Sequence, residues 1–201
     1  MMSKKEKLIR RKSICLLIII GVFLQILSGR DTLITNLTVH TVLTNLYALA
    51  YFIALIMATK KNKDKDYHPW LRFSTLSCLL LTFFIANTAL YSLYLEGNFC
   101  FSIAIIILHI IVPVLVTIDF VKAEKCTFKN HYIVTSLFPS LGYSTVWVLL
   151  LAIFPTLQCP YPFLNFRENG ILSLFISLAI ISVVMITLNY IIYKQNEKKK
   201  N

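Results

Sequence analysis

The stretch FSIAIIILHIIVPVLVTIDF, residues 101–120, decides the fold of this chain. Its twenty residues include one histidine, His109, near the middle and one carboxylate, Asp119, close to the end. At about 1.5 Å of helix per residue, such a run spans about 30 Å, the thickness of the hydrocarbon core of a bilayer. The stretch is therefore predicted to be a transmembrane helix.

The rest of the chain repeats this pattern of long apolar runs separated by clusters of charge. The 201 residues are 57% hydrophobic and 14% charged, with a mean hydropathy of +0.72. Only helices and closed barrels satisfy their backbone hydrogen bonds in lipid, and these runs are too continuous for alternating barrel strands. The sequence predicts an all-α, polytopic membrane protein with a single membrane domain over residues 1–201.

Six transmembrane helices are expected, and the distribution of Lys and Arg orients them. Eighteen basic residues lie on one side of the predicted topology, and only Arg30 and Arg167 lie on the other. Because cytoplasmic segments carry the excess of basic residues, both termini are predicted to be cytoplasmic. The use of fifteen Lys against five Arg suggests a bacterial cell membrane. The predicted helices cover about residues 13–29, 33–59, 73–95, 99–121, 132–155 and 170–193, followed by a basic tail at 194–201.

Other protein classes have less support in the sequence. The basic start followed by ICLLIIIGVFLQIL also resembles a signal peptide, but no small-residue cleavage site follows, and the remaining topology would be unchanged. The net charge of +11 is assigned to topology and to anionic lipid rather than to nucleic acid. No zinc-ligand spacing or glycine-rich phosphate loop is present, so neither a metal nor a cofactor is expected. Cys100 and Cys159 share a predicted face, where they either pair or stay free.

Polar side chains inside two of the predicted spans suggest a functional site, because such groups are costly in lipid. The second span carries one polar stripe, formed by Thr38, Thr41, Thr44 and Asn45. His40 is expected to point about 100° away from Thr41. Such stripes also serve simply to join helices by hydrogen bonds.

The fourth span places His109 near the bilayer centre, where it needs a hydrogen-bond partner or a hydrated cavity. Pro113 removes the backbone bond to the His109 carbonyl and favours a kink. Thr117 follows on the same face, and Asp119 lies near the inner surface, where Lys122 is expected to neutralise it.

Thr41 and His109 are expected at similar depths, both slightly outside the bilayer centre. A hydroxyl and an imidazole that face one cavity have the composition of a nucleophile and its general base. A hydrogen bond that only joins the two helices is the alternative.

Four local patterns occur in order along the chain. They are TVLTNL at 41–46, HIIVP at 109–113 with an acid ten residues after the His, PSLGY at 139–143 and CPYPFL at 159–164. Together with six spans, they resemble the androgen-induced-gene family of integral membrane proteins, including its bacterial branch. Two departures are His40, where an aromatic residue is usual, and Asn165, where an acid is common.

The resemblance implies a function. Animal members of this family are threonine hydrolases of fatty-acid esters of hydroxy fatty acids, and their catalytic Thr and His correspond to Thr41 and His109. The sequence thus predicts a membrane-embedded hydrolase of a lipid ester, with membrane lipids and that ester as its partners. Tyr161 and Phe163 are expected to form an outer lid or to pack at the headgroups. The remaining candidates, for the substrate pocket or the oxyanion, are Asn45, Thr44, Pro113, Thr117 and Tyr143.

Two other functions stay open at this stage. In one alternative, the same cavity binds or moves a small amphiphile without cleaving it, with His109 as a proton relay. No inverted repeat or pair of broken helices is present to favour a transporter. In the other alternative, the protein is an interaction subunit, and its buried polar groups only specify helix packing.

Overall fold

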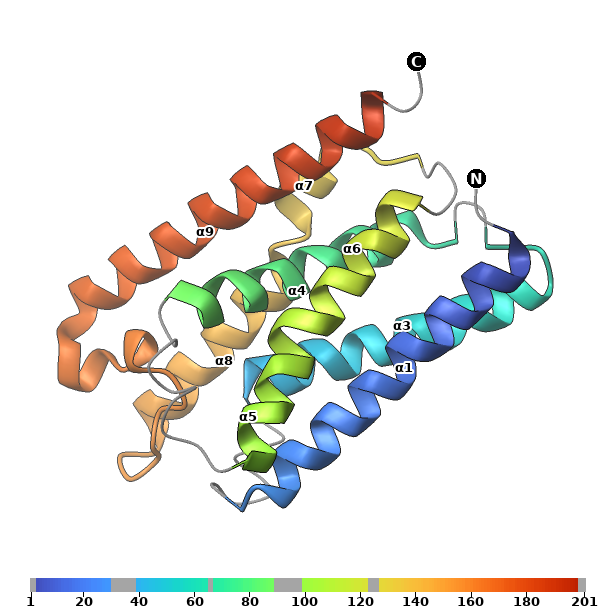
Figure 1. The fold of residues 1–201 in the computed structure, drawn as a ribbon. Helices are drawn as coiled ribbons and strands as arrows, with labels where there is room; N and C mark the ends of the chain where they lie inside the picture. Colours follow the sequence, from blue (N-terminus) through green and yellow to red (C-terminus); the bar gives the residue numbers. More distant parts are fainter. Residues whose placement is uncertain (1–2, 30–38, 65–66, 89–98, 123–126, 199–201) are drawn as a thin grey trace.

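The computed structural model describes residues 3–29, 39–64, 67–88, 99–122 and 127–198, and these residues form helices with no strand among them. The longer helices run beside one another, and the short ones interrupt or connect them (Figure 1). In chain order they are α1 (Lys4–Leu27), α3 (His40–Lys60), α4 (Pro69–Thr88), α5 (Phe99–Ile105), the π-helix η2 (Ile106–Ile111), α6 (Val112–Lys122), α7 (Tyr132–Thr135), α8 (Phe138–Ile153), the 3-10 helix η3 (Pro162–Leu164) and α9 (Phe166–Lys198).

Five helical stretches are long and apolar enough to cross a membrane: His40–Lys60, Pro69–Thr88, Phe99–Lys122, Tyr132–Ile153 and Phe166–Glu197. The prediction of an all-α membrane protein is confirmed at this level. The outer helix α9 has an apolar surface, on which Leu172, Phe175 and Val183 are each more than 60% exposed. Apolar side chains exposed over a whole helix face are typical of contact with lipid.

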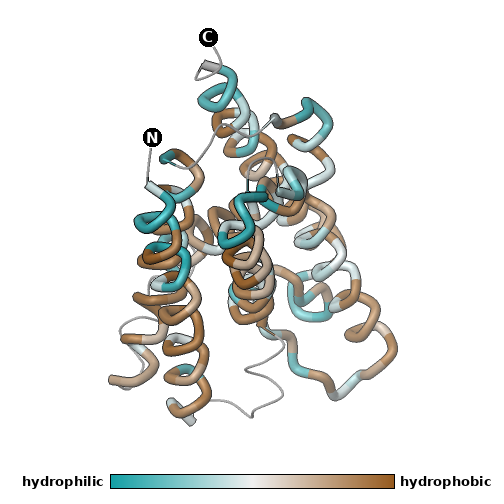
Figure 2. Tube along the Cα trace, turned by 90° about the vertical axis from the view of Figure 1, so that its right-hand side faces the viewer, coloured by the Kyte–Doolittle hydropathy of each residue, from teal (hydrophilic) through white to brown (hydrophobic). Residues whose placement is uncertain are grey.

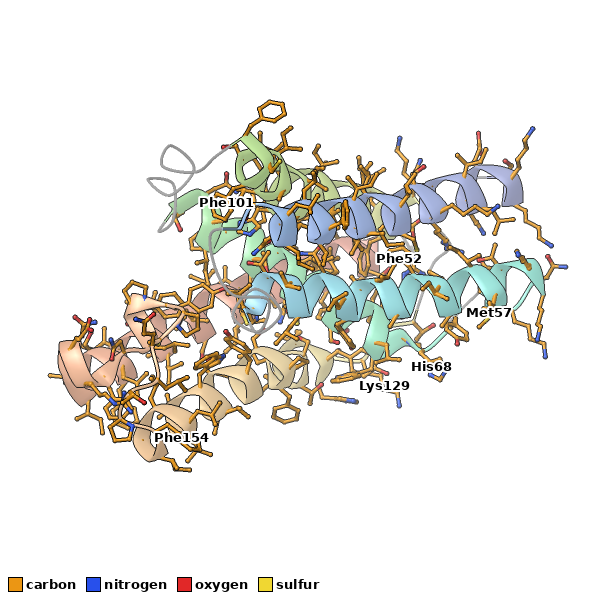
Figure 3. The ribbon with its side chains drawn as sticks, turned by 90° about the horizontal axis from the view of Figure 1, so that it is seen from below. Phe52, Met57, His68, Phe101, Lys129 and Phe154 are labelled. Carbon is orange, nitrogen blue, oxygen red and sulfur yellow. The ribbon has the colours of Figure 1, made fainter. Side chains whose placement is uncertain are left out.

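Both termini lie at one end of the helix assembly, which we call the terminal end (Figure 1). Hydrophilic residues gather there, and hydrophobic residues cover most of the remaining length (Figure 2). The side chains mark the two ends as well: Met57 and His68 lie toward the terminal end, and Phe101 and Phe154 toward the opposite one (Figure 3). The helix α1, of 24 residues, carries all six of its basic residues in its first half, at this same end.

Some helix boundaries differ from those expected. The second helix was expected from residue 33, but the described helix begins at His40, and residues 30–38, with Thr38, lie outside the described residues. The fifth is interrupted at Ser136 and Leu137, between α7 and α8. The sixth extends to Lys198, with a non-helical Gly170 at φ 79° near its start, so most of the expected basic tail is helical.

The irregularity expected at Pro113 is a π-helical turn rather than a sharp break. Within η2, the backbone N–H of Val112 donates to the carbonyl of Ile107, five residues earlier. In this wider register the carbonyl left without a donor by Pro113 is that of Leu108, one residue before His109. The amide of Asn45 lies 3.4 Å from this carbonyl oxygen and donates to it.

Gly21 permits the close approach of α1 to this irregular turn. A Cβ atom at position 21 would lie 2.6 Å from Leu108 Cδ2, closer than packed atoms tolerate. The two helices therefore meet with a small residue at the contact, as is common between membrane helices. The contact fixes the backbone that carries His109.

Buried charges at the terminal end form a cluster that we call the charge cluster, composed of Lys7, Arg11, Asp64 and Asp119. Arg11 is 1% exposed; its Nη1 lies 3.1 Å from Asp64 Oδ2 and also donates to Thr59, and its Nε lies 3.5 Å from Asp119 Oδ2. Lys7 Nζ lies 3.4 Å from Asp64 Oδ2. The cation expected to neutralise Asp119 was Lys122, but the one that contacts it is Arg11.

Candidate functional site

A small cavity of about 30 Å³ lies at the start of α3, away from the terminal end. Its walls come from α3, α4, η2, α8, α9 and the segment around η3. The polar residues that line it are His40, Thr41, Thr82, His109, Ser140, Tyr143, Ser144 and Tyr161, and the apolar ones are Leu81, Ile85, Ala86, Leu141, Phe163, Leu164 and Ile181.

Thr41 lies in the first turn of α3 and is 6% exposed. The Tyr161 hydroxyl lies within reach of the Thr41 hydroxyl and of the backbone of His40 and Thr41. Burial raises the pKa of the Tyr161 phenol, and these neighbours oppose the shift only in part. Tyr161 therefore remains protonated at neutral pH and brings a hydroxyl donor to the nucleophile candidate.

His109 reaches the same cavity from η2 and is 8% exposed. The cavity thus brings together Thr41, His109 and Tyr143, three of the candidates from the sequence, and adds Tyr161 and Phe163 from the segment expected to act as a lid. A π turn beside a proline is a frequent feature of functional sites. The second helix was expected to begin well before Thr41, but α3 begins at His40. Thr41 and His109 still line one cavity, and α5, which precedes η2, extends past the start of α3 (Figure 1).

Asn45 and Thr44 are placed elsewhere than expected. The Asn45 amide donates to the Thr41 carbonyl at 2.8 Å and to the Leu108 carbonyl at 3.4 Å, so both its hydrogens are used. The Thr44 hydroxyl contacts the Thr41 carbonyl at 3.0 Å and Thr82 at 3.2 Å. Neither side chain lines the cavity, although Thr44 lines the groove between α3 and α8, and the contacts with Leu108 and Thr82 join α3 to its neighbours.

Pro113 and Thr117 also lie outside the cavity lining. The Thr117 hydroxyl donates to the Pro113 carbonyl at 2.8 Å, within the same helix. Their contribution is therefore local: Pro113 sets the π register that carries His109, and Thr117 satisfies a carbonyl of its own helix.

His40 is the main site residue that the sequence reasoning missed. It lines the cavity next to Thr41, its Nε2 lies 3.2 Å from Ser140 Oγ, and its ring meets Tyr143 edge-on with centroids 5.0 Å apart. His40 and Thr41 were expected to point about 100° apart, but both line the cavity, which extends around the first turn of α3. The sequence does contain one signal for this site. Ser140 and Tyr143, which both contact His40, are three residues apart and therefore lie on one face of a helix.

Two grooves lie beside the cavity and share lining residues with it. The groove between α4 and α9, of about 190 Å³, shares Leu81, Ile85, Phe163 and Ile181 with it. The groove between α3 and α8, of about 310 Å³, shares His40 and Tyr143. An apolar cavity with a few convergent polar groups is the usual form of a small-molecule site.

The described residues contain no group of three or more His, Cys, Asp or Glu able to hold a metal ion. Cys100 and Cys159 are free thiols, and the Cys159 thiol donates to the Tyr161 carbonyl at 3.1 Å. No protein-family model, no curated protein and no solved structure matches the chain. Its function is therefore inferred from the residues around the cavity.

Proposed function

We propose that this protein is a membrane-embedded hydrolase that cleaves a lipid ester, with Thr41 as nucleophile and His109 as general base. The observation that carries the proposal is the position of Thr41 and His109 in the lining of one apolar cavity, although they lie far apart in the sequence. Such a cavity excludes bulk water and strengthens the interactions that act on developing charge.

The proposed reaction is an acyl transfer in two halves. The Thr41 hydroxyl oxygen bonds to the ester carbonyl carbon while His109 accepts its proton, and the bond from that carbon to the alcohol oxygen then breaks as His109 returns the proton to the alkoxide. Water next attacks the acyl-threonine with His109 again as base, which releases the fatty acid and restores the hydroxyl. The carbonyl oxygen needs hydrogen-bond donors during both halves, and the Tyr161 hydroxyl beside Thr41 is suited to this role.

The substrate proposed is a fatty-acid ester of a hydroxy fatty acid or a similar lipid ester. The resemblance of the four sequence patterns to the androgen-induced-gene family supports this class, and we propose that the chain belongs to that family. The two grooves support it independently, because they provide mostly apolar surface beside the cavity, which suits the long chains of such an ester.

The proposed topology has six spans with both termini in the cytoplasm of a bacterial cell. Beside the five spanning stretches, α1 supplies a sixth helix of 24 residues. Both termini lie at one end of the molecule, as an even number of crossings requires (Figure 1). The concentration of basic residues at that end favours the cytoplasmic side.

The proposal is tested by ester turnover with purified protein in detergent, using a p-nitrophenyl ester of a medium-chain fatty acid. Thr41→Val and His109→Gln are expected to reduce kcat/KM by about 10² to 10⁴-fold, the usual contribution of a general base and its nucleophile. The matched controls are Thr187→Val and His131→Gln, which change the same residue types at exposed positions and are expected to keep full turnover.

Two outcomes would contradict the assignment. Full turnover in folded Thr41→Val excludes Thr41 as the nucleophile. Saturable binding of the ester without turnover in any form of the protein excludes the hydrolase and favours a protein that binds or moves amphiphiles through the same cavity.

A further inference from the structure

Ser140 and His40 make a hydroxyl–imidazole contact inside the cavity. Ser140 lies in the first turn of α8 and is 4% exposed, and its Oγ is 3.2 Å from His40 Nε2 on α3. Both side chains line the cavity that also contains Thr41 and His109. A serine oxygen within about 2.6–3.2 Å of an imidazole nitrogen meets the distance requirement for activation by a general base.

We infer that Ser140 and His40 form a second nucleophile–base pair in this cavity, with Ser140 as the acyl acceptor and His40 as its base. The inference rests on the proposed ester hydrolysis, since it assigns a second, slower catalytic pair to the same bound ester, and the turnover that remains in Thr41→Val sets the upper limit of its rate. It differs from that proposal in the attacking atom, in the base and in the helices that supply them.

The surroundings of His40 favour this role over a simple link between helices. The Tyr143 ring holds the His40 ring edge-on at 5.0 Å, which restricts its orientation. The other neighbour of Ser140 Oγ is Cys78 Sγ at 3.7 Å, and sulfur is a weaker acceptor than an imidazole nitrogen. With the His40 proton on Nδ1, the Ser140 hydroxyl therefore donates to Nε2.

Other serines with side-chain partners show what a structural contact looks like in this protein. Ser74 pairs with the Tyr47 hydroxyl at 2.7 Å, and Ser136 with the Asn189 amide at 2.8 Å. Neither partner is a base at neutral pH, and neither serine lines the cavity. Ser140 combines a basic partner with access to the space that the ester would occupy.

The proposed reaction balances in the same way as any serine acyl transfer. Ser140 Oγ forms a bond to the ester carbonyl carbon and gives its proton to His40 Nε2. The bond to the alcohol oxygen breaks, and His40 passes the proton to that oxygen. Water then attacks the acyl-serine, with His40 accepting a water proton and returning it to Ser140 Oγ as the fatty acid leaves. No electron donor or acceptor is required.

The experiment maps the covalent adduct of an alkyl fluorophosphonate on the full-length protein in detergent. Attack by Ser140 on phosphorus expels fluoride and leaves a stable phosphonyl-serine, which peptide mass spectrometry locates. We expect an adduct on Ser140 in the wild-type protein. We expect its rate of formation to fall about 10²-fold or more in His40→Phe, which keeps a ring at that position but removes the base. Thr145→Val, an exposed change on the same helix, should leave the rate unaltered.

Each remaining outcome has a defined consequence. An adduct on Thr41 alone, formed at the same rate in His40→Phe, overturns the second pair and leaves the Thr41 hydrolase intact. An adduct on Ser140 whose rate is unchanged in His40→Phe overturns His40 as base. No adduct on either residue, in protein that elutes as a single species and retains its helical circular dichroism, overturns the second pair together with the hydrolase. The wild-type map needs no substitution at Ser140, so misfolding of Ser140→Ala would not affect it.

Discussion

The charge cluster at the terminal end and the cavity at the start of α3 both bury polar groups in an apolar protein, but they satisfy them differently. In the charge cluster, Arg11 contacts Asp64, Asp119 and Thr59, so the buried groups face one another. In the cavity, His109, Thr41 and several other polar side chains line one shared space of about 30 Å³. Burial of a polar residue is therefore not in itself a mark of function; a cavity shared by several such residues is the informative feature.

The largest effect on stability is expected at the centre of the charge cluster. Arg11→Met removes the cation that contacts both Asp64 and Asp119, and breaking a buried ion pair typically costs about 3–5 kcal/mol. The free energy of unfolding in mixed detergent and denaturant measures this change. Lys12→Met, at an exposed position in the same turn, is expected to stay within about 0.5 kcal/mol of wild type. Equal stability of the two variants would show that the charge cluster does not hold the fold.

The next largest effect is expected at the α1 contact that supports the cavity. Gly21→Ala places a methyl group about where Leu108 lies, and overpacking of this kind costs about 1–3 kcal/mol. Because Leu108 precedes His109, ester turnover should fall with stability. The matched control is Gly142→Ala, where nothing lies within 4 Å of the added Cβ and helix propensity favours Ala by about 1 kcal/mol. Destabilisation by both variants would point to glycine flexibility rather than to the α1 contact.

A smaller effect is expected from pH at the edge of the charge cluster. Burial raises the pKa of Asp64, but its hydrogen bond to Arg11 and the charges of Lys7 and Arg11 outweigh this, so the pKa lies below its usual value of 3.8. The folded form thus favours the charged carboxylate, and its stabilising contribution is present at neutral pH. It is lost as pH falls through 3.8 and then through the lowered pKa. Unfolding followed from pH 7 to pH 3 should show this loss in wild type and a flatter profile in Asp64→Asn.

The smallest effect on stability is expected at the cavity. Thr41→Val keeps the side-chain volume and removes one hydroxyl, which is within reach of Tyr161, so its cost should be about 1 kcal/mol or less. The same thermal or denaturant unfolding measures it, next to the large loss of turnover expected for this variant. A loss of stability as large as that of Arg11→Met would place Thr41 among the structural residues and end the contrast between the two regions.

The class of fold was readable from the sequence because lipid imposes a simple rule. A run such as residues 101–120 has to be helical where water cannot satisfy its backbone, whatever its neighbours do. Helix interruptions were less predictable. The break before α8 has a local cause in Pro139, which lacks the N–H that would donate to the carbonyl of Thr135 at the end of α7. The contact with α9 there, from the Asn189 amide to the Ile133 carbonyl at 2.9 Å and to Ser136 Oγ at 2.8 Å, joins segments too far apart in the sequence to leave a local pattern.

The candidate site was predictable to a similar extent. The polar stripe indicated Thr41 and the central position of His109 in its span indicated the histidine, and both line the cavity. The role of Asn45 was not predictable, because its partner is the Leu108 carbonyl, which loses its helical donor only when Pro113 is accommodated by a π turn. His40 was set aside because neighbouring residues of a helix point about 100° apart, but the cavity is lined by both His40 and Thr41.

The π turn also sets the rotational phase between the two polar regions. A π turn contains one residue more than an α turn, so every residue after Ile111 is rotated by about 100° relative to an uninterrupted helix. His109 lies inside this turn and faces the cavity, whereas Asp119 comes after it and meets Arg11 on α1. If η2 adopted an α register without losing a residue, Asp119 would turn about 100° away from its cation. One inserted residue thus lets a single helix present a reactive group at one depth and an anchoring group at another.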